Sequence, residues 1–334
     1  MPARLTVHFP SRPARVYLLP EGRETVVGRD EDCDVVLDDD RVSRRHAVLV
    51  PDGSSWSITD AGSKNGTFIG GTLVASRLLQ ERSWVSFGGL IARFEQLSVP
   101  VERIEEERLR RLTTSLELRR GLDPGAGLDE LLPRVVASML ELTNAERGFL
   151  LLAGPAGDLE VAARSGLSWE DLQAKEFGGS LGAVQRVLAT GEPVVSTDVR
   201  SDSELGERAS VIATGIRALL CVPVRALDRL IGVMYADSRR PGAAFTELDL
   251  EILEALAAQA GLAIAVARLD QELKGLAHRI AEAPGTDPGL RQQLAGEVSG
   301  VLERSLQVAR PTSHGLESWT GALAALPPPL GAGT

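Results

Sequence analysis

Aromatic residues, cysteines and long apolar runs are all scarce in this sequence. Aromatic side chains make up 4% of its 334 residues, so alanine, leucine, valine and glycine must fill the interior. The two cysteines, Cys33 and Cys221, form neither a metal motif nor a disulfide framework, which indicates a reducing compartment. No run reaches the roughly 18 apolar residues of a membrane-spanning helix, and the start lacks the apolar core of a signal peptide. We therefore expect a cytoplasmic protein with no membrane partner.

Positive charge is also in deficit, since the net charge is −10. Affinity for a phosphate backbone comes from dense Lys and Arg surfaces, so direct nucleic-acid binding is not expected. The sequence contains no P-loop, nucleophile elbow or zinc-ligand spacing. Its four histidines are too widely spaced for a metal or catalytic cluster: His8, His46, His278 and His314. We expect neither an enzyme, nor a required cofactor, nor a metal site.

Turn residues divide residues 1–98 into many short stretches of alternating apolar and polar character. Examples are RLTVHF, TVVGR, HAVLVPD and SWSITD. Short strands at near-regular spacing are typical of an all-β sandwich rather than of βαβ units. The length of the whole chain suggests about two domains, so we expect this sandwich to be followed by a second domain.

Residues 99–121 are highly charged and place Leu109, Leu112 and Leu116 three and four positions apart, which predicts a helical linker. Residues 122–268 then mix amphipathic stretches with buried apolar runs. This mixture indicates a second domain of α+β class, so the chain is expected to be a multidomain protein.

The apolar residues near the end of the second domain alternate at intervals of four and three. The series runs from Leu248 to Ile280, and its only polar member is Gln259. Heptads sustained over this length predict a coiled coil. Because residues 269–283 outlast the domain, they need another partner, and we expect a homodimer. Residues 284–334 offer little apolar material and are predicted to be a mostly disordered, flexible tail.

Three motifs of glycine, hydroxyl and basic residues occur in order within the predicted sandwich. They are Gly28-Arg29 at a strand end, Ser43-Arg44-Arg45-His46 after a turn, and Ser63-Lys64-Asn65-Gly66-Thr67 in a later turn. This set resembles the forkhead-associated (FHA) domain, and the resemblance covers residues 1–98. It implies a domain that binds phosphothreonine peptides.

The residue types fit that chemistry, because a phosphate dianion needs charge-assisted hydrogen bonds in a fixed geometry. An arginine offers two parallel donors, a hydroxyl offers one more, and a lysine adds a mobile charge. By resemblance, Arg29 and Ser43 hold the phosphate, Arg44 and Lys64 add donors, and Asn65 holds the peptide main chain. The resemblance further implies that Gly28, His46 and Gly66 shape the pocket and that Arg41 lies in a loop reading the flanking residues. The neighbouring Asp38-Asp39-Asp40 run is most simply a solvated turn.

The second domain resembles a GAF domain through the segments ALLCVPVR, LIGVMYADS and FTELDLEILEALAAQAGLAIA. The resemblance implies an antiparallel sheet backed by helices, with a pocket for a small molecule on the other face. The cyclic-nucleotide signature is not kept, because Leu250 follows Asp249 where the family has glutamate. Cys221 lies in a predicted core strand and is read as a small buried hydrophobe rather than a bilin attachment site. An unidentified small-molecule ligand stays an open alternative.

Together the two resemblances imply a bacterial signalling adaptor that binds a threonine-phosphorylated protein downstream of a Ser/Thr protein kinase. Its GAF domain would act as a sensor or as a dimerisation module. One alternative is a structural dimeric scaffold whose GAF domain binds no ligand. A second alternative is a regulatory subunit of a sigma-54-type transcriptional system.

Overall fold

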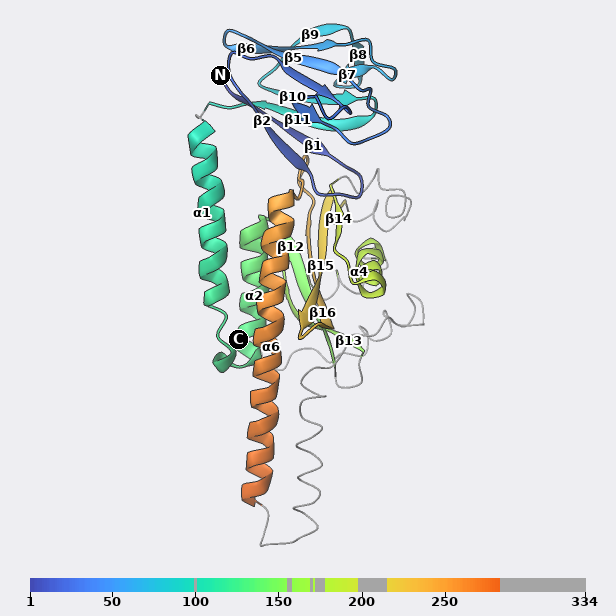
Figure 1. The fold of residues 1–334 in the computed structure, drawn as a ribbon. Helices are drawn as coiled ribbons and strands as arrows, with labels where there is room; N and C mark the ends of the chain where they lie inside the picture. The colour runs from blue at the N-terminus through green and yellow to red at the C-terminus, as the bar shows by residue number, and fades with distance from the viewer. Residues whose placement is uncertain (99–100, 155–157, 169–170, 172–177, 198–214, 283–334) are drawn as a thin grey trace. The chain divides into compact units, whose positions relative to one another are not determined.

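The computed structural model describes residues 1–98, 101–154, 158–168, 171, 178–197 and 215–282 (Figure 1). It confirms the multidomain fold that the sequence predicts. An all-β sandwich comes first, a helical linker follows, and an α+β domain ends in a long helix. The predicted tail at 284–334 lies outside the described residues.

The sandwich consists of two sheets. The first sheet has the order β2-β1-β11-β10-β7-β8, and the second has the order β4-β3-β5-β6-β9. The strands of the sandwich are β1 (Ala3–His8), β2 (Arg15–Leu19), β3 (Thr25–Gly28), β4 (Val35–Val36), β5 (Ala47–Asp52), β6 (Ser55–Asp60), β7 (Thr67–Ile69), β8 (Thr72–Val74), β9 (Ser76–Leu79), β10 (Arg82–Phe87) and β11 (Leu90–Gln96).

Alternation along the strands builds the core between the sheets. Successive side chains of a strand point to opposite faces, so every second residue turns inward. On β6, Trp56 and Ile58 are fully buried, and on β10 Val85 and Phe87 are buried between the exposed or half-buried residues beside them. The Trp56 indole donates to the Met1 carbonyl at 2.9 Å. The aromatic and aliphatic side chains of both sheets thus form one cluster that holds the strand ends in place.

Strand direction brings the motif-bearing loops to one edge of the sandwich. Strands β3 and β5 are antiparallel, and so are β5 and β6. The end of β3, the start of β5 and the end of β6 therefore lie at the same edge. Strand β10 is antiparallel to β7, which brings the β10–β11 turn to this edge as well.

The linker contains helix α1 (Val101–Arg120), which agrees with the predicted linker helix. Two leucines of its predicted apolar stripe, Leu109 and Leu116, are exposed at 63% and 48%. A short 3-10 helix, η1 (Pro124–Ala126), follows, with the Asp123 carboxylate accepting the Gly125 N–H as its cap. Helix α2 (Leu128–Thr143) then begins the second domain.

The second domain is built on a sheet of order β13-β12-β16-β15-β14. Its strands are β12 (Arg147–Ala153), β13 (Leu159–Ser165), β14 (Val194–Ser196), β15 (Ala218–Ala226) and β16 (Arg229–Ser238). The pairs β12–β13, β12–β16 and β15–β16 are antiparallel, as expected. The turn between β15 and β16 has positive φ at Leu227 and Asp228, 47° and 62°, which suits a two-residue hairpin. Helix α4 (Gly178–Thr190) lies on one side of the sheet (Figure 1).

Helix α6 (Glu247–Glu282) closes the second domain and confirms the predicted C-terminal helix. One face packs on the domain, where Leu253, Leu256 and Ile264 are buried. Among the described residues, Glu247–Leu276 is the one stretch long and apolar enough to cross a membrane by length and composition, and 56% of its most apolar window is buried. A core helix meets the same criterion. The coiled-coil pairing of residues 269–283 stays a prediction.

Candidate functional site

A hollow of about 730 Å³ lies at the sandwich edge where the three loops meet. The β3–β4, β4–β5 and β6–β7 loops line it. Its lining residues are Arg29, Asp30, Asp40, Arg41, Val42, Ser43, Arg44, Arg45, Gly62, Lys64 and Asn65. All five residues that the sequence assigns to phosphopeptide contact therefore border one space, and so does Arg41. Of the three residues assigned to shaping, Gly28, His46 and Gly66, none lines the hollow.

Gly28 allows two of the loops to lie against each other. The Arg29 N–H donates to the Ser43 carbonyl at 3.0 Å, and the Asp30 N–H donates to the Arg44 carbonyl at 3.1 Å. A Cβ on residue 28 would lie 2.1 Å from the Arg44 carbonyl oxygen, far inside any allowed contact. Only glycine fits this approach, so the Gly-Arg motif fixes the position of Arg29 relative to Ser43.

His46 joins the second loop to the third through its imidazole ring. The ring is fully buried; its Nδ1 accepts the Ser43 N–H at 3.0 Å, and its Nε2 lies 3.1 Å from the Gly66 carbonyl. Because Nδ1 accepts, Nε2 carries the proton and donates to Gly66. Burial lowers the pKa of His46 below its ordinary 6.5, which keeps the ring neutral and preserves both hydrogen bonds.

Asp60 organises the third loop, and the sequence reasoning missed it. Its carboxylate accepts from the Ser63 hydroxyl and the Thr67 hydroxyl, both at 2.6 Å, and from the backbone N–H groups of Gly62 and Ser63. Burial alone would raise its pKa, but these hydrogen bonds prevail and lower it. An aspartate two positions before a glycine is an Asx-turn pattern, and that pattern could have identified it. Gly66 completes this turn with φ of +80°.

Ser43 is arranged as a donor toward the hollow. The Lys64 backbone N–H donates to the Ser43 hydroxyl oxygen at 2.9 Å. Within the described part of the chain, the hydroxyl proton has no acceptor, so it is available to a bound anion. Asn65 lies beside it and donates from its side-chain amide to the Arg41 carbonyl at 2.7 Å.

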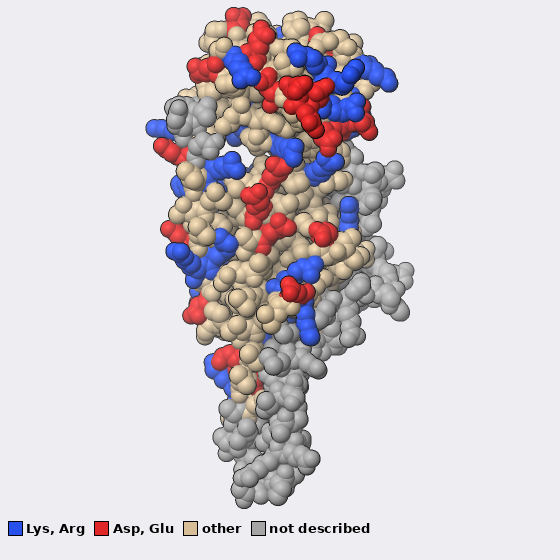
Figure 2. Space-filling model, viewed as in Figure 1, with Lys and Arg blue, Asp and Glu red and all other residues tan. Residues whose placement is uncertain are grey.

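Five cationic side chains and two carboxylates line the hollow. Arg44, Arg45 and Lys64 are exposed and have no carboxylate partner among the residues that the structure describes. Figure 2 shows such basic side chains gathered beside acidic ones on the sandwich. Three unpaired positive charges around a donor hydroxyl can bind a doubly charged anion of the size of a phosphate group.

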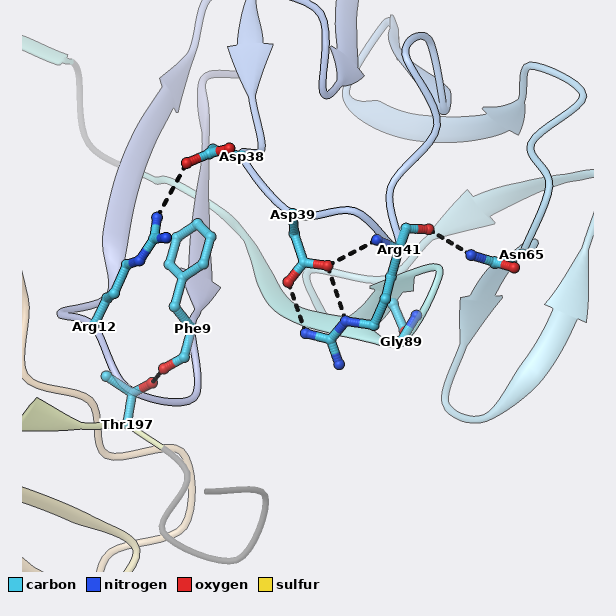
Figure 3. A network of polar contacts seen from close by, with 9 residues as sticks. Phe9, Arg12, Asp38, Asp39, Arg41, Asn65, Gly89 and Thr197 are labelled. Atoms are coloured by element: carbon cyan, nitrogen blue, oxygen red, sulfur yellow. Dashed lines mark hydrogen bonds and ion pairs between the residues drawn. The ribbon is translucent and has the colours of Figure 1, made fainter. Parts of the chain in front are cut away.

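The other two arginines at the hollow pair with carboxylates of the acidic run, in which the Asp38 and Asp40 side chains are 74% and 98% exposed, as a solvated turn predicts. Asp39 binds Arg41 through two guanidinium contacts of 2.9 and 2.8 Å, drawn in Figure 3. The hydrogen bond from Arg41 lowers the pKa of Asp39. Asp40 accepts from Arg29 Nη1 at 3.1 Å. Asp38 accepts from Arg12 at 3.2 Å (Figure 3). Each carboxylate of the run therefore has an arginine partner.

The sheet of the second domain is packed with side chains on the side of α4. Phe149 and Tyr235 stack with their ring centroids 4.7 Å apart, and Cys221 is buried beside them. Val184 and Val187 of α4 belong to the same cluster. Burial strongly raises the pKa of the Cys221 thiol, so this cysteine is a packed core residue as expected. The described residues include no group of three or more His, Cys, Asp or Glu side chains that could hold a metal ion.

Comparison with known proteins identifies both domains. Residues 25–88 match the family model of the FHA domain, and residues 127–264 match that of the GAF domain.

Three curated relatives illustrate the similarity. The chain is 50% identical over 44 residues to the FHA domain-containing protein FhaB of Mycolicibacterium smegmatis, a match that covers 13% of this chain and 28% of that protein. It is 41% identical over 64 residues to the glycogen accumulation regulator GarA of the same species, covering 19% and 40%. It is 27% identical over 147 residues to the Nif-specific regulatory protein of Sinorhizobium fredii, covering 43% and 25%. The chain therefore spans less than half of the length of each relative.

Proposed function

Because the chain carries an FHA domain followed by a GAF domain, we propose that it is a phosphothreonine-dependent adaptor of bacterial signalling. In this role the FHA domain binds a threonine-phosphorylated protein downstream of a Ser/Thr protein kinase. FHA and GAF domains are typically non-catalytic binding or regulatory modules, and the proposal assigns no reaction to either. It assigns the protein to the cytoplasm.

The observation that carries the proposal is the grouping of unpaired donors at one edge of the sandwich. Ser43 presents a free hydroxyl proton, and Arg44 and Lys64 lack carboxylate partners within the described residues. A phosphate dianion satisfies all three groups at once, whereas a neutral ligand leaves the charges unpaired. We assign Arg29 and Ser43 to the phosphate, Arg44 and Lys64 to further donors, Asn65 to the peptide main chain, and Arg41 to the flanking residues.

The matched relatives support this reading. FhaB and GarA match stretches of 44 and 64 residues, and GarA is named as a regulator. The match to a Nif-specific regulatory protein supports a second candidate, a regulatory partner in a sigma-54-type transcriptional system. If the full chain captured a transcription factor in the absence of any phosphopeptide, that result would favour the second candidate.

For the GAF domain we propose a dimerisation role, with residues 99–121 as linker, 122–268 as the domain and 269–283 as a coiled-coil extension. Two observations support it. The described side chains on the α4 face of the sheet pack against one another. In addition, Leu262, Val266 and Leu273 of α6 are 43–49% exposed although they belong to the heptad series. The domain would then bring together two copies of the FHA module.

The proposed function is tested by titrating the full chain with phosphothreonine peptides in a calorimeter. We expect binding by the natural chain and loss of at least about thirtyfold in affinity for Arg29→Ala or Ser43→Ala, because charged hydrogen bonds are lost. Arg77→Ala is the matched control, since Arg77 is an exposed arginine on β9 away from the hollow. The unphosphorylated peptides should not bind. If no peptide from an oriented phosphothreonine library binds the natural chain, the proposal is wrong.

A further inference from the structure

Arg29 and Arg41 are held by neighbouring carboxylates in two different ways. Asp39 binds Arg41 through two guanidinium contacts, and the Asp39 side chain is only 17% exposed. Asp40 makes a single contact to Arg29, 3.1 Å long, and its side chain is 98% exposed. A half-buried ion pair with two parallel contacts is strong, whereas an exposed ion pair with one contact contributes little to stability. Arg41 is therefore fixed, and Arg29 can be released.

The carboxylate on Arg29 occupies the place that an incoming anion would take. Both residues line the same hollow, and Asp40 stands against the guanidinium that the proposed function assigns to phosphate. A dianion can displace it, because the dianion also gains Ser43, Arg44 and Lys64. The displaced carboxylate stays near the new phosphate, because Asp40 lies one residue before the fixed Arg41.

The displaced carboxylate of Asp40 then lies close to the negative charge of the phosphate. A free carboxylate next to a phosphate is destabilising, since like charges repel at short range. Asp30, on the same lining, adds a second negative charge, while the unpaired cations Arg44, Arg45 and Lys64 are available to the phosphate. A cationic side chain in the bound peptide removes the repulsion by pairing with the freed carboxylate.

We infer that Asp40 determines which phosphothreonine peptides the FHA domain prefers: it holds Arg29 in the empty site and, once displaced, selects a lysine or arginine near the phosphothreonine. This role rests on the proposed function. It makes Asp40 a specificity residue that weakens binding of peptides with neutral flanks.

The test is a cycle of two proteins and two kinds of peptide, measured by fluorescence anisotropy on the full chain at low salt. The proteins are the natural chain and Asp40→Asn. The peptides carry one phosphothreonine, with either alanine throughout or a single lysine at one of the three positions on each side. We expect the natural chain to prefer lysine by about threefold to fivefold at one or more positions. Asp40→Asn should bind the all-alanine peptide about threefold more tightly and lose the lysine preference.

Two further variants keep the test specific. Asp40→Glu should retain the preference, because it keeps the carboxylate. Asp52→Asn is the matched control and should behave as the natural chain, since Asp52 ends β5 at the edge opposite the hollow. The preference should fade at 1 M salt, where the screening length falls to about 3 Å.

The outcomes separate this inference from the proposed function. Phosphothreonine binding without a lysine preference, or a preference that survives in Asp40→Asn, overturns the role of Asp40 and leaves the proposed function standing. Failure of every phosphothreonine peptide to bind the natural chain overturns both.

Discussion

His46 organises two loops at the hollow although it does not line the hollow itself. Its two ring nitrogens join the loop of Ser43 to the loop of Gly66, and its side chain is fully buried. These two hydrogen bonds add to those that Lys64 and Asn65 make between the same loops. Protonation of Nδ1 would turn an acceptor into a donor facing the Ser43 N–H and would break the join.

We predict that His46 stays neutral below its ordinary pKa of 6.5. Because burial lowers the pKa in the folded chain, the unfolded chain binds a proton more readily as the pH falls. The stability that neutral His46 provides is therefore complete above pH 6.5 and is lost as the pH falls through the lowered folded-state pKa. Imidazole 15N shifts measured across this range should show Nε2 protonated, Nδ1 unprotonated and a midpoint below 6.5. A midpoint at or above that value would contradict the arrangement.

The residues of the site divide into those that sequence patterns predicted and those that they did not. Arg29, Ser43 and Lys64 belong to spaced motifs, and the structure brings them together as expected. The roles of Asp40 and Asp60 were not predicted. The partners of Asp60 lie in its own loop, where the Asx-turn pattern could have indicated them. The partner of Asp40 lies in another loop, so only the pairing of the two loops supplies it.

At the scale of elements, α6 carries one buried and one exposed apolar face. Leu253, Leu256 and Ile264 are buried against the domain. Leu262, Val266 and Leu273 are exposed and continue the heptad series. Valine at one core position with leucine at the next favours a parallel two-stranded coiled coil, and Gln259 within the seam would fix its register. We propose that this second face packs against a second copy of the helix.

We predict that Leu262→Glu combined with Val266→Glu converts a dimer into a monomer. On each chain two charged side chains replace two apolar side chains of the predicted coiled-coil interface, so the dimer should weaken by at least about a hundredfold. Native mass spectrometry of the full chain measures this change, and it also reveals any small molecule retained by the GAF domain. Leu227→Glu is the control, because Leu227 is 71% exposed in the β15–β16 turn. A natural chain that is monomeric at micromolar concentration would contradict the predicted coiled-coil interface.

The elements themselves were largely predictable. Strand alternation and turn residues predicted the β-sandwich, and the apolar segments ALLCVPVR and LIGVMYADS correspond to β15 and β16. The two faces of α6 were harder to separate, because both consist of apolar residues and the heptad count includes Ile252, which is buried in its own domain. Sequence periodicity identifies a helix that buries much surface, but it does not say against which partner.

The whole chain combines an acidic average with one local basic site. Its net charge is −10, yet the lining of the hollow carries five cations against two carboxylates. An acidic surface disfavours unspecific binding to nucleic acids and to acidic proteins, while the hollow keeps a local excess of positive charge. Charge therefore affects which partners can bind both over the whole surface and at the hollow.

We predict that the dimer binds a doubly phosphorylated partner more tightly than a singly phosphorylated one. Two FHA modules in one assembly make the second binding event intramolecular, which raises affinity by about a hundredfold if the linker can span both sites. The measurement compares one-phosphothreonine and two-phosphothreonine peptides, the latter joined by a series of flexible Gly/Ser linkers. Leu262→Glu with Val266→Glu should abolish the gain but leave the affinity for one phosphothreonine unchanged. Equal affinities for both peptides at every linker length would argue against the paired arrangement.

The close approach of Gly28 to the Arg44 carbonyl has a consequence for how such a module can diversify. The backbone frame tolerates no side chain at position 28, where a Cβ would lie 2.1 Å from that oxygen. The rim residues Asp40 and Arg45, by contrast, project from exposed loops and can be exchanged without disturbing the frame. Duplicated copies of this domain can thus change the charge around the hollow through these rim positions alone, while the backbone frame is inherited intact.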